Sequence, residues 1–310
     1  MKTRKTTFVI GFIGLAAFAV SSCKKDTPPD PAMPVIEHME VGLGDNGIGV
    51  IGEDFHVEMD VVAGDRIDVI QVRIEQRPDE TYAREWRHEI TWEQYRGAKN
   101  TNVHKHFDIP EDAPEGTYDF VIVVRDQNGA KLEETRVLNI FLRENLPVDP
   151  QLSIFNIHKN DNFFYRDGKF VDTDVCRSGE TIRSQVTIGG LKGDGVMYIL
   201  LINKKLNHRP ETVDGIDFSK AIVYDVYQHE GWAEVGYFSN SVFDLETFTS
   251  VRTAPPLIIG AANDNNAPQN NPISGERAWE SGDYLFGVVY KNTTHNISFY
   301  QYVDIKVAID

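Results

Sequence analysis

The chain has 310 residues, and its 47 Asp and Glu outnumber its 31 Lys and Arg, which gives a formal net charge of −16. So acidic a chain is a poor partner for nucleic acid or for an anionic membrane surface, whereas cations and neutral ligands remain compatible with it. Its length is sufficient for two hydrophobic cores.

The N-terminus has the pattern of an export signal. Lys2, Arg4 and Lys5 precede an apolar run over residues 8–20, which is too short to span a bilayer comfortably and ends in the small residues Ser21 and Ser22. We therefore expect residues 1–22 to be a signal peptide and not a transmembrane helix.

The residue that follows, Cys23, makes this segment resemble the lipobox of bacterial lipoproteins, although Val20 stands where Leu is usual. The resemblance implies cleavage before Cys23, lipidation of its thiol, and a polar tether over residues 23–33. The Lys-Lys-Asp after Cys23 resembles lipoproteins of the Bacteroidota, which implies an outer-membrane lipoprotein on the periplasmic face or the cell surface. An ordinary secretory signal with an incidental cysteine is the alternative. If Cys23 carries lipid, Cys176 has no partner for a disulfide.

Short alternating segments separated by Gly, Pro, Asn and Asp follow from Pro34 onward. The pattern predicts strands near residues 35–42, 53–62, 66–76, 84–92, 101–109, 116–126 and 130–142. Seven short strands in about a hundred residues are typical of an antiparallel β-sandwich of immunoglobulin type. We assign this domain to residues 34–144.

Local features favour the same fold. Tyr118, just after Gly116 at a strand start, has the position of the tyrosine corner of such sandwiches. Residues 126–129, Asp-Gln-Asn-Gly, predict a turn into the last strand, since Asn and Gly tolerate positive φ. Residues 145–150, which include two prolines, are the expected linker.

Residues 151–310 also have a β pattern. Gly282, Tyr284 and Phe286 repeat the spacing of Gly116, Tyr118 and Phe120, and both sets precede a turn and a closing strand. A second β-sandwich is therefore expected, so that the fold class is all-β with two tandem immunoglobulin-like sandwiches. Its long segments 203–219 and 261–275 are expected to be loops of the kind that bind ligands or are disordered.

Histidines supply the candidate chemistry. Alternation along residues 53–61 buries Phe55, Val57, Met59 and Val61 and places His56, Glu58 and Asp60 on the outer face. The same rule places His104, His106 and Asp108 on the outer face of the strand at 101–109. If the two strands are neighbours, the three imidazoles converge on a metal, with Glu58 or His88 completing the ligands. Zn²⁺, Cu²⁺ or Ni²⁺ suits these nitrogens. The alternative is an ordinary polar strand face.

Residues 34–142 resemble the domain-of-unknown-function 4625 family of Bacteroidota lipoproteins. The likeness is carried by Asp54-Phe-His56-Val-Glu58, by Val103-His-Lys-His-Phe-Asp-Ile-Pro110, and by Gly116-x-Tyr118 followed by Val124-x-Asp126-x-x-Gly129. The family implies an immunoglobulin-like domain and an address in the cell envelope, but no settled activity. Members often carry one more histidine where this chain has Gln76, so the ligand set is incomplete here unless His88 substitutes.

Other patterns in the sequence do not indicate a functional site. Residues 42–47 fit the glycine spacing of a dinucleotide site, but an alternating strand follows instead of a helix, which favours a loop between strands. Asp161, Asp167, Asp172 and Asp174 lack the spacing of a Ca²⁺ loop. No nucleophile elbow or comparable catalytic arrangement is visible, so a non-enzymatic protein is expected.

The sequence is compatible with three functions. The first is a lipid-anchored protein that captures a transition metal and feeds an outer-membrane transporter. The second is an accessory lipoprotein that binds a glycan or peptide through the loops of the second domain, with Trp232 and Trp279 at the site and the first sandwich as a spacer. The third is a structural or adhesive surface protein.

Overall fold

The computed structural model describes residues 32–309. The expected signal peptide, Cys23 and all of the tether except its last residues lie outside the described part. Ala32–Asp310 forms one compact unit. Strands make up most of it, and its helical segments are four 3₁₀ turns, η1 (Glu93–Tyr95), η2 (Arg143–Asn145), η3 (Lys204–Leu206) and η4 (Gly275–Arg277). None of the helical segments in residues 32–309 has the length and hydropathy that a membrane crossing requires. The all-β prediction is confirmed.

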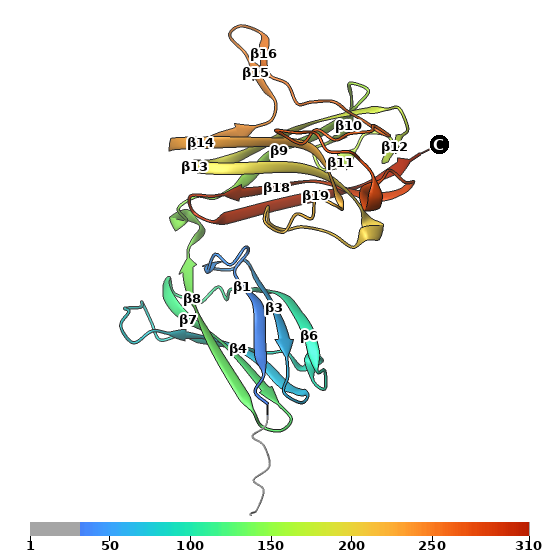
Figure 1. Cartoon of the computed structure of the whole chain (residues 1–310). Helices are drawn as coiled ribbons and strands as arrows, with labels where there is room; N and C mark the ends of the chain where they lie inside the picture. Colours follow the sequence, from blue (N-terminus) through green and yellow to red (C-terminus); the bar gives the residue numbers. More distant parts are fainter. Residues whose placement is uncertain (1–31, 310) are drawn as a thin grey trace, which may run out of the picture. The chain divides into compact units, whose positions relative to one another are not determined.

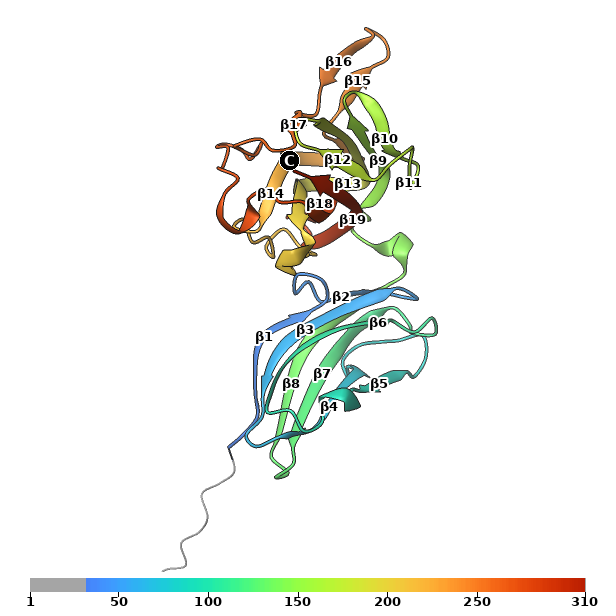
Figure 2. The ribbon, with the colours of Figure 1, turned by 90° about the vertical axis from the view of Figure 1, so that its right-hand side faces the viewer.

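The N-terminal sandwich, residues 35–141, consists of two sheets that face each other (Figure 2). One has the order β1-β3-β6 and the other the order β2-β8-β7-β4-β5. The strands are β1 (Val35–Val41), β2 (Ile48–Val50), β3 (Asp54–Val62), β4 (Ile67–Gln76), β5 (Arg87–Thr91), β6 (Asn100–Asp108), β7 (Gly116–Asp126) and β8 (Lys131–Phe141). Seven of them match the predicted strands. The sequence did not predict β2, because three residues are too few to show a period of two.

Alternating apolar residues form the core of this sandwich. Phe55, Val57, Met59 and Val61 of β3 are each at most 1% exposed, and they pack with the inward residues of the opposite sheet. The strand pairs are antiparallel except for β2 with β8, which is parallel. The core fixes the register of β3, and with it the residues that point away from the core.

The predicted tyrosine corner is present, and it occurs twice. The Tyr118 hydroxyl donates to the carbonyl oxygen of Pro114 at 2.6 Å. The Tyr284 hydroxyl donates in the same way to the carbonyl oxygen of Glu280 at 3.1 Å, again four residues upstream. The repeated glycine and tyrosine spacing therefore marks the same local structure in both halves of the chain.

The C-terminal sheet, residues 151–308, is a nine-stranded sheet that is hydrogen-bonded throughout (Figure 1). Its strands are β9 (Gln151–Lys159), β10 (Asn162–Arg166), β11 (Lys169–Phe170), β12 (Val175–Arg177), β13 (Thr181–Asn203), β14 (Ala221–Ser239), β17 (Leu257–Ile258), β18 (Gly282–Asn292) and β19 (Ile297–Ala308). The pair β15 (Val242–Asp244) and β16 (Thr249–Arg252) forms a separate hairpin, which projects at the top of Figure 1. Strands β12 and β19 pair in parallel.

The long strand β13 organises this half. Its first part pairs with β9, and its last part pairs with both β18 and β14. Between them the register shifts around Leu191 and Gly193, where Gly193 has a φ of +73° that favours glycine. Further along, Ile199 and Leu201 pack in one apolar cluster while Leu200 and Ile202 pack in another, so the sheet buries both faces here.

The two long segments predicted as loops are largely irregular. After Asn203, the last residue of β13, the segment 203–219 contains only η3. The segment 261–275 contains an isolated bridge between Asn263 and Pro272 and the start of η4.

Candidate metal centre

Three imidazoles meet on the outer face of the sheet β1-β3-β6. Strands β3 and β6 are antiparallel neighbours in which His56 lies opposite His106 and Glu58 lies opposite His104. Because residues two apart on a strand share a face, His104 and His106 point to the same side as His56. The sequence-based condition for convergence, that the two strands are adjacent, is therefore met.

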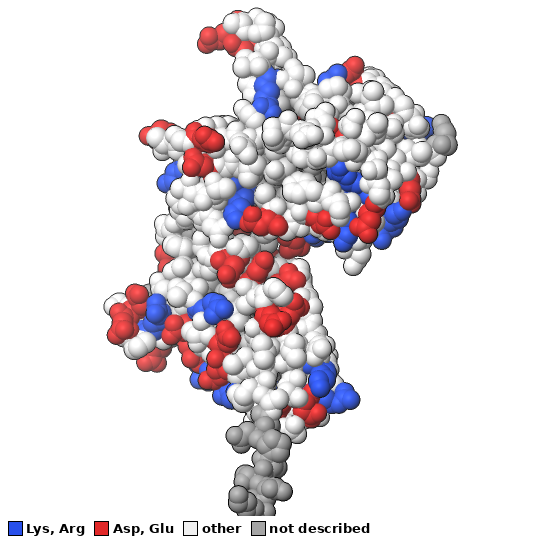
Figure 3. All heavy atoms as spheres, in the orientation of Figure 1, with Lys and Arg blue, Asp and Glu red and all other residues white. Residues whose placement is uncertain are grey.

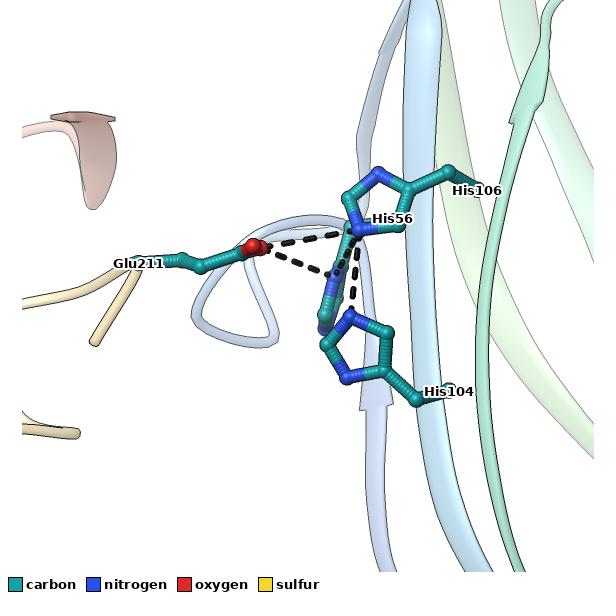
Figure 4. Close-up of side chains that lie close together, drawn as sticks. All are labelled: His56, His104, His106 and Glu211. Carbon is teal, nitrogen blue, oxygen red and sulfur yellow. Dashed lines mark hydrogen bonds and ion pairs between the residues drawn. The ribbon is translucent and has the colours of Figure 1, made fainter. Parts of the chain in front are cut away.

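The nitrogens come close to one another and to a carboxylate that the sequence did not suggest. His106 Nε2 lies 3.2 Å from His104 Nε2 and 3.4 Å from His56 Nδ1. Glu211 Oε2 lies 3.6 Å from His56 Nδ1 and 3.6 Å from His106 Nε2. The four residues each offer one ligand atom, and these atoms all lie within 4.8 Å of one another. Figure 4 shows the four side chains pointing toward a common centre.

These separations suit a small metal ion. Zn²⁺ bound tetrahedrally at about 2.0–2.1 Å from nitrogen and oxygen requires ligand atoms about 3.3–3.4 Å apart, the edge of the tetrahedron. The four separations given above, 3.2, 3.4, 3.6 and 3.6 Å, lie close to that value. Small side-chain adjustments would bring three nitrogens and one oxygen to bonding distance of one ion.

Two buried polar atoms at the site have no hydrogen-bond partner, Glu211 Oε2 and His56 Nε2. An unpaired buried polar atom is costly, and a cation next to Glu211 Oε2 would remove that cost. His56 Nε2 faces Glu40 Oε2 at 3.6 Å, which is longer than a hydrogen bond and allows only an ion pair. Interaction with His56 lowers the pKa of Glu40.

In each imidazole, the ring nitrogen that does not face the cluster lies near a carboxylate. Asp54 Oδ2 lies 2.6 Å from His106 Nδ1, Glu58 Oε2 lies 3.4 Å from His104 Nδ1, and Glu40 faces His56 as described. Carboxylates in this position orient metal-binding histidines and make them better donors. Glu58 is thus placed behind His104 and not among the converging atoms. Figure 3 shows carboxylate residues gathered over the region of β1 and β3.

The surroundings differ from the exposed face that the sequence predicted. His56 lies on the predicted outer face of its sheet, but it is only 5% exposed, because other parts of the chain cover it. Strand alternation gives the side on which a residue points, but it does not reveal what covers that side. A cavity of about 100 Å³ remains beside His56 and His106, lined also by Leu43 and Tyr300.

Glu211 is held firmly by its own half of the chain. The preceding residue, Pro210, accepts a 2.6 Å hydrogen bond from the Tyr302 hydroxyl. The Arg209 guanidinium lies 5.3 Å from the ring centres of both Tyr300 and Tyr302. Burial, with a further contribution from the negative charge of Glu211, raises the pKa of Tyr300 to about 12. The Glu211 carboxylate therefore projects from a loop that is fixed to the C-terminal sheet.

His88, the other candidate from the sequence, lies elsewhere. It is on β5, in the other sheet of the sandwich, and its ring stacks on Trp86 with the centres 6.1 Å apart. Burial lowers the pKa of His88. The cluster found in residues 32–309 does not include it.

The structure also shows where other features of the sequence lie. Residues 42–47 connect β1 to β2, and Gly42, Gly44 and Gly47 all have positive φ, as a glycine-rich loop between strands requires. The Trp279 indole donates to the Ala261 carbonyl oxygen at 2.9 Å. The Trp232 ring packs 4.5 Å from the ring of His229.

Fold and site together define an all-β protein with a candidate three-histidine, one-carboxylate metal centre. Residues 21–141 match the family described as Domain of unknown function (DUF4625), which confirms the resemblance of the N-terminal sandwich. No curated protein matches the chain in sequence.

Solved structures similar to this chain include dimeric latent PorU from Porphyromonas gingivalis, with 9% identity and a TM-score of 0.29 over 93% of this chain and 21% of that one. Escherichia coli alpha-2-macroglobulin activated by porcine elastase has 10% identity and a TM-score of 0.23 over 90% of this chain and 24% of that one. A Ca²⁺-stabilized adhesin of an Antarctic ice-binding bacterium has 12% identity and a TM-score of 0.20 over 90% of this chain and 49% of that one. The chain spans less than half of each, and the TM-scores support no conclusion on function.

Proposed function

We propose that this protein is a lipid-anchored, non-enzymatic protein of the cell envelope that binds one transition-metal ion at His56, His104, His106 and Glu211. The observation that carries the proposal is the convergence of three imidazole nitrogens on a buried carboxylate oxygen that has no hydrogen-bond partner. The anchor at Cys23, the outer-membrane address and delivery to an outer-membrane transporter are further parts of the proposal, and they rest on the N-terminal sequence.

The donor set narrows the choice of metal. Three imidazoles and one carboxylate suit Zn²⁺, and also Cu²⁺ or Ni²⁺. Ca²⁺ and Mg²⁺ prefer oxygen ligands alone, and Cu⁺ prefers sulfur. Four protein ligands leave no position for a substrate in a tetrahedral shell, which is the arrangement of zinc sites without catalytic function. The site thus supports binding in preference to catalysis.

The direct test is metal analysis of the soluble chain, residues 24–310 without an affinity tag, before and after titration with Zn²⁺, Cu²⁺ and Ni²⁺. We expect about one equivalent to bind, and a His104→Ala/His106→Ala variant to lose it. The variant should keep its fold, because His104 is 45% exposed and His106 is 29% exposed. A variant with His38→Ala and His295→Ala is the control, since it also lacks two imidazoles but retains the cluster. Equal binding by the wild type and the His104/His106 variant would contradict the proposal.

A further inference from the structure

We propose that the metal ion also links the C-terminal sheet to the N-terminal sandwich and fixes their relative position, because its ligands come from both. This inference rests on the proposed metal binding. His56, His104 and His106 belong to β3 and β6 of the sandwich, whereas Glu211 belongs to the loop between η3 and β14. An ion bound by all four residues joins the two halves at a point distant in sequence from their covalent connection.

The hydrophobic clusters do not provide this connection. Among the described residues, one hydrophobic cluster contains only members from Ile36 to Ile140, and the other two contain only members from Leu152 onward. Burial of apolar surface therefore stabilises each half separately. None of these hydrophobic clusters spans the junction between the halves.

Among the described residues, the polar contacts near the junction are few. Arg143 pairs with Glu53 and, at 2.7 Å, with Asp149, and these side chains are between 33% and 44% exposed. Pairs of this kind are weakened by solvent and salt. Near the site, one hydrogen bond runs from Asn296 Nδ2 to the Gly44 carbonyl oxygen at 3.2 Å. Bonds from a metal to four ligands, of which His56 is buried, would be the strongest of these connections.

Glu211 can transmit this constraint because its loop is fixed to the C-terminal sheet. In addition to the contacts of Arg209 and Pro210, Ile216 is buried in an apolar cluster with Val213 packed against it. Asp214 pairs with Lys291 of β18. Metal binding by Glu211 thus positions the whole sheet and not a mobile side chain alone.

Distance measurements between spin labels test the inference on the soluble chain. Lys131 and Lys169 are exposed and lie one in each half, so the substitutions Lys131→Cys and Lys169→Cys place one spin label in each half. The natural Cys176 is buried, and burial raises its pKa to about 12, so it should not take up label. Zn²⁺ is diamagnetic and does not disturb the measurement. We expect a narrow distance distribution with one equivalent of Zn²⁺ and a broad one after removal of the metal with a chelator.

The variant that separates the inference from the proposed function is Glu211→Gln. It should bind Zn²⁺ through the three histidines at least about tenfold more weakly, and its distribution should stay broad when Zn²⁺ is saturating. Asp217→Asn removes a charge from the same loop, where the Asp217 carboxylate contacts Ser219 and Lys220, and it is the control that should behave as wild type. One equivalent of bound Zn²⁺ with no change in the wild-type distances overturns the inference but leaves the proposed function intact. A narrow distribution for Glu211→Gln also overturns it. Absence of Zn²⁺ binding overturns both.

Discussion

Asp54 Oδ2 lies 2.6 Å from His106 Nδ1, across the β3–β6 pair and on the side of the imidazole that faces away from the cluster. A carboxylate at this position keeps the proton on Nδ1, so that Nε2 presents its lone pair to the centre where His56 Nδ1 and His104 Nε2 also lie. The geometry of this contact makes Asp54 an orienting residue.

Replacing Asp54 by Asn should therefore weaken Zn²⁺ binding by about 10- to 100-fold, the usual effect of removing such a partner. Calorimetric titration measures the change. Asp108→Asn is the matched control, because Asp108 lies opposite Asp54 in the register of the same strand pair but is not part of the cluster. Equal affinity of the Asp54 and Asp108 variants would show that the contact has no role in binding.

The two candidates from the sequence that lie outside the converging atoms should behave differently from each other. Glu58→Gln should reduce the affinity for Zn²⁺, since Glu58 Oε2 lies 3.4 Å from His104 Nδ1. His88→Ala should leave the affinity unchanged, because His88 is on β5 in the other sheet. Competition with a coloured chelator would measure both. A loss of binding in the His88 variant would mean that the ligand set is not the one seen here.

The two tyrosine corners should contribute similarly to stability. Tyr118→Phe and Tyr284→Phe each remove a hydroxyl that bonds to a backbone carbonyl oxygen, at Pro114 and Glu280. We expect each substitution to lower the free energy of unfolding by about 1–3 kcal/mol, measured by urea denaturation. Tyr237→Phe is the control, since Tyr237 is 74% exposed. An effect at Tyr118 or Tyr284 no larger than at Tyr237 would show that the tyrosine-corner hydrogen bonds do not stabilise the fold.

Acid should destabilise the C-terminal sheet partly through His229. This residue is 5% exposed, its Nε2 lies 2.9 Å from the Tyr290 hydroxyl, and burial lowers its pKa. The folded state then binds fewer protons than the unfolded state, so the contribution of His229 is present above about pH 6.5 and is lost as the pH falls through the folded-state pKa. Urea unfolding at pH 8 and pH 5 should show a smaller decrease in His229→Gln than in wild type. If the free energy of unfolding of His229→Gln decreases between pH 8 and pH 5 as much as that of the wild type, groups other than His229 cause the acid sensitivity.

The strands of the N-terminal sandwich were predictable because their sequence alternates cleanly. In β3, Phe55, Val57, Met59 and Val61 leave only one arrangement that buries them together, and this places His56 on the other face. The same reasoning predicted the face of His104 and His106. In the C-terminal sheet, β13 is a nearly continuous apolar run near Ile199, because both faces are buried, so alternation did not reveal its pairing.

Glu211 was not predictable from the sequence. It lies more than a hundred residues after His106, in a loop whose length suggested ligand binding but whose residues gave no sign of their target. The burial of His56 was missed for the same reason, since alternation describes one strand and its sheet but not the loops that cover them. Sequence reasoning thus reached the imidazoles and their face, and the fourth ligand required the three-dimensional structure.

The ligand atoms of the proposed site are all nitrogen or oxygen, and the one cysteine in the described residues, Cys176, is buried apart from them. Thiolate ligands are lost when sulfur is oxidised to a disulfide or an acid, whereas imidazole and carboxylate do not enter that chemistry. With Zn²⁺, which has no redox chemistry, a centre built in this way would retain its ion under oxidising and reducing conditions alike. Its occupancy by Zn²⁺ would respond to metal supply and proton concentration, and not to redox potential.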